Sequence, residues 1–185
     1  MMKPIKDKLY WLYPEGTVPN SIIDYTLEQL KDKERQAGRI GKGKNDDMRK
    51  VEKIPMDEFD PLSVLLYGYA RKANDLVWNY DLVGPCQFEM LYYENQGDQY
   101  DFHVDTLWFD NGLCRKLTVL SFMNDDYEGG DFLIKTDDRA TNIVKLDTPK
   151  GGILVFPTFL MHAVKPIVSG KRISCVGWIT GPMLK

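Results

Sequence analysis

The chain is poor in histidine and cysteine. It contains two histidines, His103 and His162, and three cysteines in 185 residues. The cysteines, Cys86, Cys114 and Cys175, are odd in number and lack any CxxC spacing, so neither a disulfide framework nor a structural zinc site is indicated. This cysteine usage fits a reducing compartment, and we expect a cytoplasmic location.

The chain also lacks a strong charge of either sign and any long apolar run. Its net charge is −3 and its pI is about 5.4, so no global field attracts it to nucleic acid or to an anionic membrane. No window approaches the ~18 apolar residues of a membrane span, and the first ten residues lack the apolar core of a signal peptide. We therefore expect a soluble protein that binds neither nucleic acid nor membranes.

The amino-terminal half is expected to be mainly helical. After a strand-like piece at 10–14, an N-cap precedes apolar residues at helical spacing over about 20–32. A second helix should begin at Asp60-Pro61 and end near Asn79. Between them, the charged and glycine-containing segment 31–53 is interpreted as a solvated loop, with a substrate-facing flap as the alternative.

From residue 87 onward the apolar period changes from helical to alternating, which is typical of β-strands. Eight short strands are expected, at 87–94, 99–105, 115–123, 131–136, 142–146, 152–157, 161–167 and 172–179. Evenly spaced strands with helices only before them predict a mainly β fold, a double-stranded β-helix (jelly roll) buttressed by two helices. A length of 185 residues fits one domain, with helical support over 1–86 and the jelly roll over 87–180.

Three residues have the chemistry of a metal site. His103 and Asp105 are two positions apart, so on a strand they project from the same face. His162 follows 57 residues after Asp105 and joins them only if the fold brings strand ends together. Two histidines and one carboxylate form the facial triad of non-haem Fe(II) sites, although an HxD pair by itself is a weak signal.

A single charge interrupts an apolar strand face near the chain end. Alternation places Arg172, Ser174, Val176 and Trp178 on one face of strand 172–179. A buried arginine requires a partner, and its planar fork suits a carboxylate. From the residues alone, a bound carboxylate and an internal Asp or Glu remain alternatives.

Several motifs occur together and in order. They are Tyr93 and Tyr100-Asp-Phe-His103-Val-Asp105, then Arg115 to Asn124, Tyr127-Glu-Gly-Gly-Asp-Phe-Leu133, Pro157, His162, Pro166, Ser169-Gly170, Arg172 and Trp178. Over about residues 87–180 the chain thereby resembles the Fe(II)/2-oxoglutarate-dependent oxygenases, specifically the prolyl 4-hydroxylase-like branch with the bacterial PKHD-type hydroxylases. Residues 39–50 also resemble the strand region that precedes the barrel in this branch.

The resemblance implies a role for each matching residue. It implies that His103, Asp105 and His162 hold Fe(II), and that Arg172, with Ser174, binds the distal carboxylate of 2-oxoglutarate. It further implies that Tyr93 lies along the co-substrate and that Trp178 belongs to its pocket; Thr118, Leu120 and Phe122, which alternate onto one strand face, are expected to form a wall of that pocket.

Two comparisons place the chain within this group. Phe122 stands where the oxygen-sensing prolyl hydroxylases have a tyrosine that helps to bind the same carboxylate, which points to the PKHD-type side. AlkB-like repair enzymes match less well, because their Arg-x-Asn-x-Thr-x-Arg pattern is missing after His162.

The activity implied is hydroxylation of a C–H bond coupled to oxidative decarboxylation of 2-oxoglutarate by O2, with ascorbate as a reductant. A prolyl residue in a peptide or protein is the expected substrate, and a free amino acid or other small molecule is the alternative. A jelly-roll binding module with a vestigial metal site is a third interpretation. The oligomeric state stays open, as does the role of four aromatic residues that grip a substrate or only pack at the rim: Tyr92, Trp108, Phe109 and Tyr127.

Overall fold

The computed structural model describes residues 9–38, 48–136 and 142–183. Within this part, seven antiparallel strands form a major sheet in the order β1-β11-β7-β14-β5-β4-β2. Their bounds are β1 (Trp11–Tyr13), β11 (Ile153–Pro157), β7 (Leu113–Phe122), β14 (Arg172–Pro182), β5 (Gly84–Tyr93), β4 (Glu52–Met56) and β2 (Gln36–Ala37).

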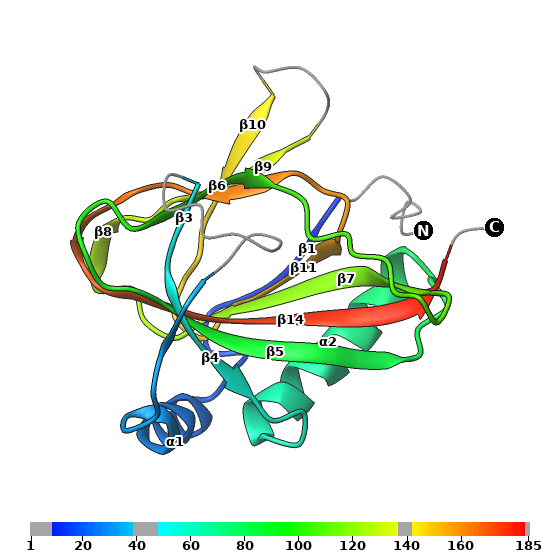
Figure 1. Cartoon of the computed structure of the whole chain (residues 1–185), viewed down its shortest axis with the longest axis horizontal. Coiled ribbons are helices and arrows are strands. Elements are labelled where there is room, and N and C mark those ends of the chain that lie inside the picture. Colours follow the sequence, from blue (N-terminus) through cyan, green and yellow to red (C-terminus); the bar gives the residue numbers. More distant parts are fainter. Residues whose placement is uncertain (1–8, 39–47, 137–141, 184–185) are drawn as a thin grey trace.

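A smaller sheet faces the major one (Figure 1). Its five described strands follow the order β10-β9-β12-β6-β3, and β8 and β13 form a separate pair. The bounds are β10 (Ile143–Leu146), β9 (Phe132–Lys135), β12 (His162–Val164), β6 (Gln99–His103), β3 (Arg49–Lys50), β8 (Tyr127–Gly129) and β13 (Ile167–Gly170). The predicted mainly β, jelly-roll architecture is confirmed.

Two helices cover the face of the major sheet that points away from the smaller sheet (Figure 1). They are α1 (Asn20–Leu30) and α2 (Pro61–Val77), close to the predicted bounds. Helix α2 begins as its sequence predicts, because the Asp60 side chain accepts a hydrogen bond from the Leu62 backbone N–H and Pro61 occupies the first turn. Neither described helix has the length and apolarity that a membrane crossing requires.

The alternation of side chains along the major strands supplies two cores, one on each face of the sheet. Met90 and Val119 pack toward the helices, against residues such as Leu66. Leu91 and Leu120 point the other way and pack between the sheets. The second core surrounds the residues that the sequence marks as chemical, so the jelly roll itself encloses the candidate site.

The charged segment 31–53 is not simply a solvated loop. Strands β2, β3 and the beginning of β4 lie within it, and β4 pairs with β5 over Glu52–Met56. The interpretation was wrong there because the charges have partners: the Lys53 ammonium contacts the buried Glu89 carboxylate. Residues 39–47 lie outside the described residues, so the flap alternative is not addressed there.

Candidate metal and co-substrate site

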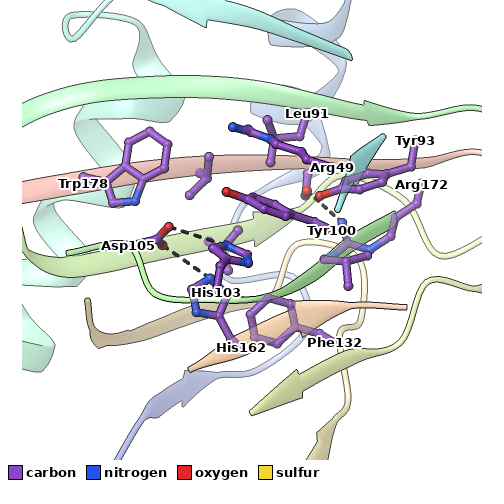
Figure 2. A pocket seen from close by; sticks show the side chains of 14 residues that line it. Arg49, Leu91, Tyr93, Tyr100, His103, Asp105, Phe132, His162, Arg172 and Trp178 are labelled. Atoms are coloured by element: carbon purple, nitrogen blue, oxygen red, sulfur yellow. Dashed lines mark hydrogen bonds and ion pairs between the residues drawn. The ribbon is translucent and has the colours of Figure 1, made fainter. Parts of the chain in front are cut away.

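His103, Asp105 and His162 converge at one end of the two-sheet core. Each offers one ligand atom, and the three atoms lie within 4.8 Å of one another. His103 ends β6 and His162 begins β12, and the two are directly opposite in the antiparallel register. The Asp105 carboxylate reaches both imidazoles, with Oδ1 3.6 Å from His103 Nε2 and Oδ2 3.4 Å from His162 Nε2 (Figure 2).

Asp105 is not on the strand that the alternation predicted. Strand β6 ends at His103, and the Asp105 backbone N–H instead donates to the Thr158 carbonyl at 2.8 Å. The Thr118 hydroxyl donates to Asp105 Oδ2, also at 2.8 Å. Two residues from other parts of the fold therefore fix the carboxylate where it meets both histidines.

Both histidines have the same ring nitrogen engaged by the backbone. His103 Nδ1 lies 2.7 Å from the Asp101 carbonyl oxygen, and His162 Nδ1 lies 2.8 Å from the Leu160 carbonyl oxygen. Since a carbonyl only accepts, each Nδ1 carries the proton when the ring is neutral. Each Nε2 is then an unprotonated acceptor near the Asp105 oxygens, so three acceptors are grouped as a metal ion requires.

The environment keeps these groups ready to bind a cation. Burial, together with the neighbouring His162, lowers the pKa of His103 to about 4. Burial alone would raise the pKa of Asp105, but His162 and His103 lower it, and the carboxyl pKa lies below its ordinary value. At neutral pH His103 is therefore neutral and Asp105 ionised, as metal binding requires.

Arg172 lies in the same core with its charge unmatched. The residue is 1% exposed, and its Nη1 donates to the Ser174 hydroxyl at 3.0 Å. Nε and Nη2 are buried without a hydrogen-bond partner, and no carboxylate in the described residues pairs with the guanidinium. The internal salt bridge that the sequence left open is thus not found there. A buried cation with two free donors fits a bound anion.

One pocket contains both the triad and Arg172 (Figure 2). Its free volume is about 30 Å³, which is room for roughly two waters. Besides the triad and Arg172, the pocket is lined by Arg49, Leu91, Tyr93, Tyr100, Leu120, Phe132, Val164, Ser174, Val176 and Trp178.

The predicted pocket residues divide into two groups. Tyr93, Leu120, Ser174 and Trp178 line the pocket as expected. Thr118 and Phe122 do not line it: Thr118 reaches the site through Asp105 instead, and Phe122 is part of the inter-sheet core. The position of Thr118 on the inner face of β7 was thus foreseen, but its contact was not.

Sequence reasoning missed Arg49 as a pocket residue. This buried side chain comes from β3, and its guanidinium carbon lies 4.6 Å from the centre of the Tyr100 ring. Tyr100 in turn stacks on His103, with ring centres 3.5 Å apart and planes at 10°. Arg49 is also 3.8 Å from the Glu89 carboxylate. The sequence did not single out Arg49 because it lies within the charged segment 31–53.

The four aromatic residues whose role the sequence left open have different surroundings in the structure. Tyr92 is buried in the core on the helix side, away from the pocket, under the Arg35 guanidinium at 3.9 Å. Tyr127 packs against the inter-sheet core from β8, and its hydroxyl contacts Thr148. Trp108 is 65% exposed and lines a second cavity, together with Thr106 and Thr158. Phe109 lines neither the triad pocket nor this second cavity.

With this geometry established, comparison with known proteins identifies the family. The family model of the 2OG-Fe(II) oxygenase superfamily matches residues 88–180, half of the chain. The chain belongs to this superfamily. Membership implies Fe(II), 2-oxoglutarate and O2, and the residues present fit them. Two imidazoles and a carboxylate suit Fe(II), and the unpaired Arg172 donors suit a carboxylate of 2-oxoglutarate.

Curated relatives of this oxygenase carry the name PKHD-type hydroxylase, in agreement with the branch that the motifs resemble. One from Synechococcus sp. (strain CC9605) is 34% identical over 112 residues, which cover 60% of this chain and 49% of the relative. Another, from Hyphomonas neptunium, is 37% identical over 89 residues, covering 45% and 38%. The chain spans about half the length of the curated relatives it matches.

Solved structures of low identity share the fold. A Trichoplax adhaerens prolyl hydroxylase, in complex with a hypoxia inducible factor peptide fragment, superposes with a TM-score of 0.75 at 18% identity, over 92% of this chain and 83% of that one. The viral collagen prolyl hydroxylase of Paramecium Bursaria Chlorella virus-1 gives 0.70 at 18%, over 94% and 97%. These oxygenases confirm the jelly-roll architecture.

Proposed function

We propose that this oxygenase is a 2-oxoglutarate-dependent dioxygenase that hydroxylates a C–H bond of a prolyl residue in a peptide or protein. The observation that carries the reaction type is Arg172, a buried guanidinium with two unpaired nitrogens in the same pocket as two histidines and a carboxylate. A metal-binding module would need the triad alone. A co-substrate site also requires a cation near the triad that can bind the anionic co-substrate.

Each residue has a distinct task in this proposal. His103, Asp105 and His162 hold Fe(II), which when bound supplies the activation of O2 coupled to decarboxylation of 2-oxoglutarate to succinate and CO2. Arg172 and Ser174 bind the distal carboxylate of the co-substrate through the charged fork and the hydroxyl. The protein's own contribution is orientation and exclusion of water.

The remaining pocket residues shape the co-substrate site. Tyr93 and Leu120 form walls of the proposed co-substrate site. Trp178 lies beside Asp105 (Figure 2). Thr118 acts through Asp105, whose orientation it fixes by a hydrogen bond. Phe122 has no hydroxyl to share the carboxylate, and the Arg172 guanidinium carbon lies 5.7 Å from the centre of its ring. Arg172 therefore carries most of that contact.

A prolyl substrate is supported by the relatives, because several carry the name hydroxylase and the two superposed structures are described as prolyl hydroxylases. A free amino acid or small molecule remains the alternative, because the residues that match the family hold cofactors while loops select substrates. We also propose that residues 1–185 act as one oxygenase domain in the cytoplasm, with ascorbate as reductant.

The test is succinate release from 2-oxoglutarate with Fe(II), against a panel of proline-containing peptides and free amino acids. We expect succinate and hydroxylated product in equal amounts with at least one member of the panel. The controls are a sample whose metal has been removed by a chelator and the His162→Ala variant, and neither should release succinate. Substrate-dependent succinate release with free amino acids but no peptide would replace the peptide proposal by its alternative. If the wild type releases no succinate and also fails to bind Fe(II) or 2-oxoglutarate, the proposal that the protein is an enzyme is refuted.

A further inference from the structure

A second and larger cavity is lined by residues that neighbour Asp105. Its volume is about 400 Å³, within the size range of small-molecule sites. Thr106 and Thr158 form the wall nearest the triad: Thr106 follows Asp105 in the chain, and the Thr158 carbonyl accepts the Asp105 backbone N–H. The residues that line it are Tyr80, Thr106, Trp108, Cys114, Arg115, Lys116, Thr158, Phe159 and Met183.

Two consecutive cations line this cavity because of an irregularity in the sheet. Along the β14–β7 pair, Ile179 is opposite Leu117, but the next residue, Thr180, is opposite Arg115. Lys116 is therefore the extra residue of a β-bulge, a feature that redirects side chains at the edges of sites. Two neighbours that would point to opposite faces of a regular strand both line one cavity.

Neither cation has an acidic partner within the described chain. The Lys116 side chain is only 9% exposed, but its ammonium is not among the buried unpaired atoms and therefore reaches solvent, and it makes no hydrogen bond or ion pair with the described residues. Arg115 stacks on the Trp178 ring at 3.8 Å and donates from Nη2 to the Gln87 side-chain oxygen at 3.3 Å, but its Nε is buried and unpaired. By contrast, the partly buried Lys53 has the Glu89 carboxylate.

Apart from the two cations and the two threonines, the cavity wall is mainly apolar. Trp108 is 65% exposed and Phe159 is 62% exposed, and exposed apolar side chains grouped around a cavity are typical of binding sites. A ligand that satisfies this wall has an apolar part, and one that satisfies Arg115 and Lys116 has a negative charge. A carboxylate beside an apolar side chain meets both requirements.

We propose that this cavity is a substrate subsite that binds a carboxylate of the substrate through Lys116 and Arg115, with an apolar group held against Trp108 and Phe159. The inference rests on the proposed function, and it names the substrate class more closely: a peptide with an acidic or carboxyl-terminal residue near the hydroxylated position. Trp178, which lines the triad pocket and carries Arg115 on its ring, couples the subsite to the reacting centre.

The binding test uses N-acetyl-L-phenylalanine and N-acetyl-L-phenylalaninamide, which differ in the carboxylate alone. Each is titrated calorimetrically into the Fe(II)- and 2-oxoglutarate-loaded protein without O2. We expect the acid to bind about 10- to 100-fold more tightly than the amide, the range for a hydrogen bond to a charged group. Lys116→Met and Arg115→Gln should each reduce this preference. The matched control Lys72→Met, on the outer side of α2, should keep it.

Equal binding of acid and amide to the wild type, or an unchanged preference in Lys116→Met, would overturn the subsite. The Kd for 2-oxoglutarate is measured in each variant, because Arg115→Gln also disturbs the Trp178 stack. Lys116 has no such contact, so Lys116→Met with unchanged 2-oxoglutarate affinity isolates the effect. If both variants lose 2-oxoglutarate binding but keep the preference for the acid over the amide, the two cations have a structural role instead.

A turnover test distinguishes the source of the carboxylate. Proline-containing peptides are compared in three forms: with a free carboxyl terminus near the proline, with that terminus amidated, and amidated with a neighbouring aspartate. A preference for the first form assigns a terminal carboxylate, and a preference for the third assigns a side chain. Turnover with equal kcat/KM for all three refutes the inference but leaves the proposed function intact. If no peptide is turned over, the proposed function fails while the binding test still decides the subsite.

Discussion

Replacing Arg172 separates the co-substrate role from a structural one. If the fork receives the distal carboxylate of 2-oxoglutarate, Arg172→Lys keeps the charge but loses the two-pronged contact, and Arg172→Met loses both. Removal of a charged, paired contact costs about 2–5 kcal/mol, or ~30- to several thousand-fold in apparent affinity. Because Phe122 offers no hydroxyl in compensation, we expect Arg172→Met to fall toward the upper end.

The same substitution should hardly affect folding. Within the described residues the guanidinium donates one hydrogen bond, to Ser174, and its other nitrogens stay unpaired. Losing that bond costs about 1 kcal/mol, while removing a buried unpaired charge stabilises the fold. The two effects oppose one another, so the Tm of Arg172→Met without co-substrate should equal or exceed that of the wild type.

The assay measures the Tm without co-substrate and the 2-oxoglutarate dependence of succinate release, on the same preparations. Fe(II) affinity is measured as well and should be unchanged, since Arg172 is not among the grouped metal-binding residues. A large fall in Tm together with an unchanged 2-oxoglutarate dependence would refute the reasoning. It would show that the guanidinium has a structural partner and that the unpaired nitrogens do not mark a ligand site.

Three further outcomes follow from the site. His162→Ala should abolish turnover and weaken Fe(II) binding in an anaerobic titration, whereas wild-type affinity in this variant would disprove the triad. Thr118→Val should weaken Fe(II) affinity about 10- to 100-fold because Asp105 loses the bond that orients it, while Thr118→Ser should restore it. Gly130→Ala should raise the KM for 2-oxoglutarate, since the new Cβ would lie 2.9 Å from Arg172 Cδ at a backbone φ of +62°; an unchanged KM would mean that Arg172 tolerates displacement.

The elements that the sequence predicted are those whose signals are local. Helix α2 follows from its capped Asp60-Pro61 start, and the long strands follow from alternation, because both depend on neighbours in the chain. The triad was predicted for a different reason, the scarcity of histidine. Its exact support was not: Asp105 lies beyond β6 and is held by Thr158 and Thr118, which are distant in sequence.

What the sequence could not predict depends on pairing between distant strands. The run of charge at 31–53 looks solvated because hydropathy ignores partners, yet Lys53 and Arg49 are matched by the buried Glu89 of a strand some forty residues later. The bulge at Lys116 is equally invisible, since it exists only in the register between β7 and β14. Regular alternation would have placed Arg115 and Lys116 on opposite faces.

The charged segment 31–53 and the bulge at Lys116 both concern cations of low exposure, and these cations fall into two groups. Lys53 and Arg49 have an internal carboxylate and stabilise the junction between β4, β3 and β5. Arg172 and Lys116 have none in the described chain; Arg172 lines the pocket that contains the triad, and Lys116 lines the second cavity. For Arg172, whose unpaired nitrogens are buried, the missing partner destabilises the fold unless a ligand supplies one, whereas the Lys116 ammonium is not among the buried unpaired atoms. We therefore propose that both cations bind anions: Arg172 the co-substrate, and Lys116 a carboxylate of the substrate.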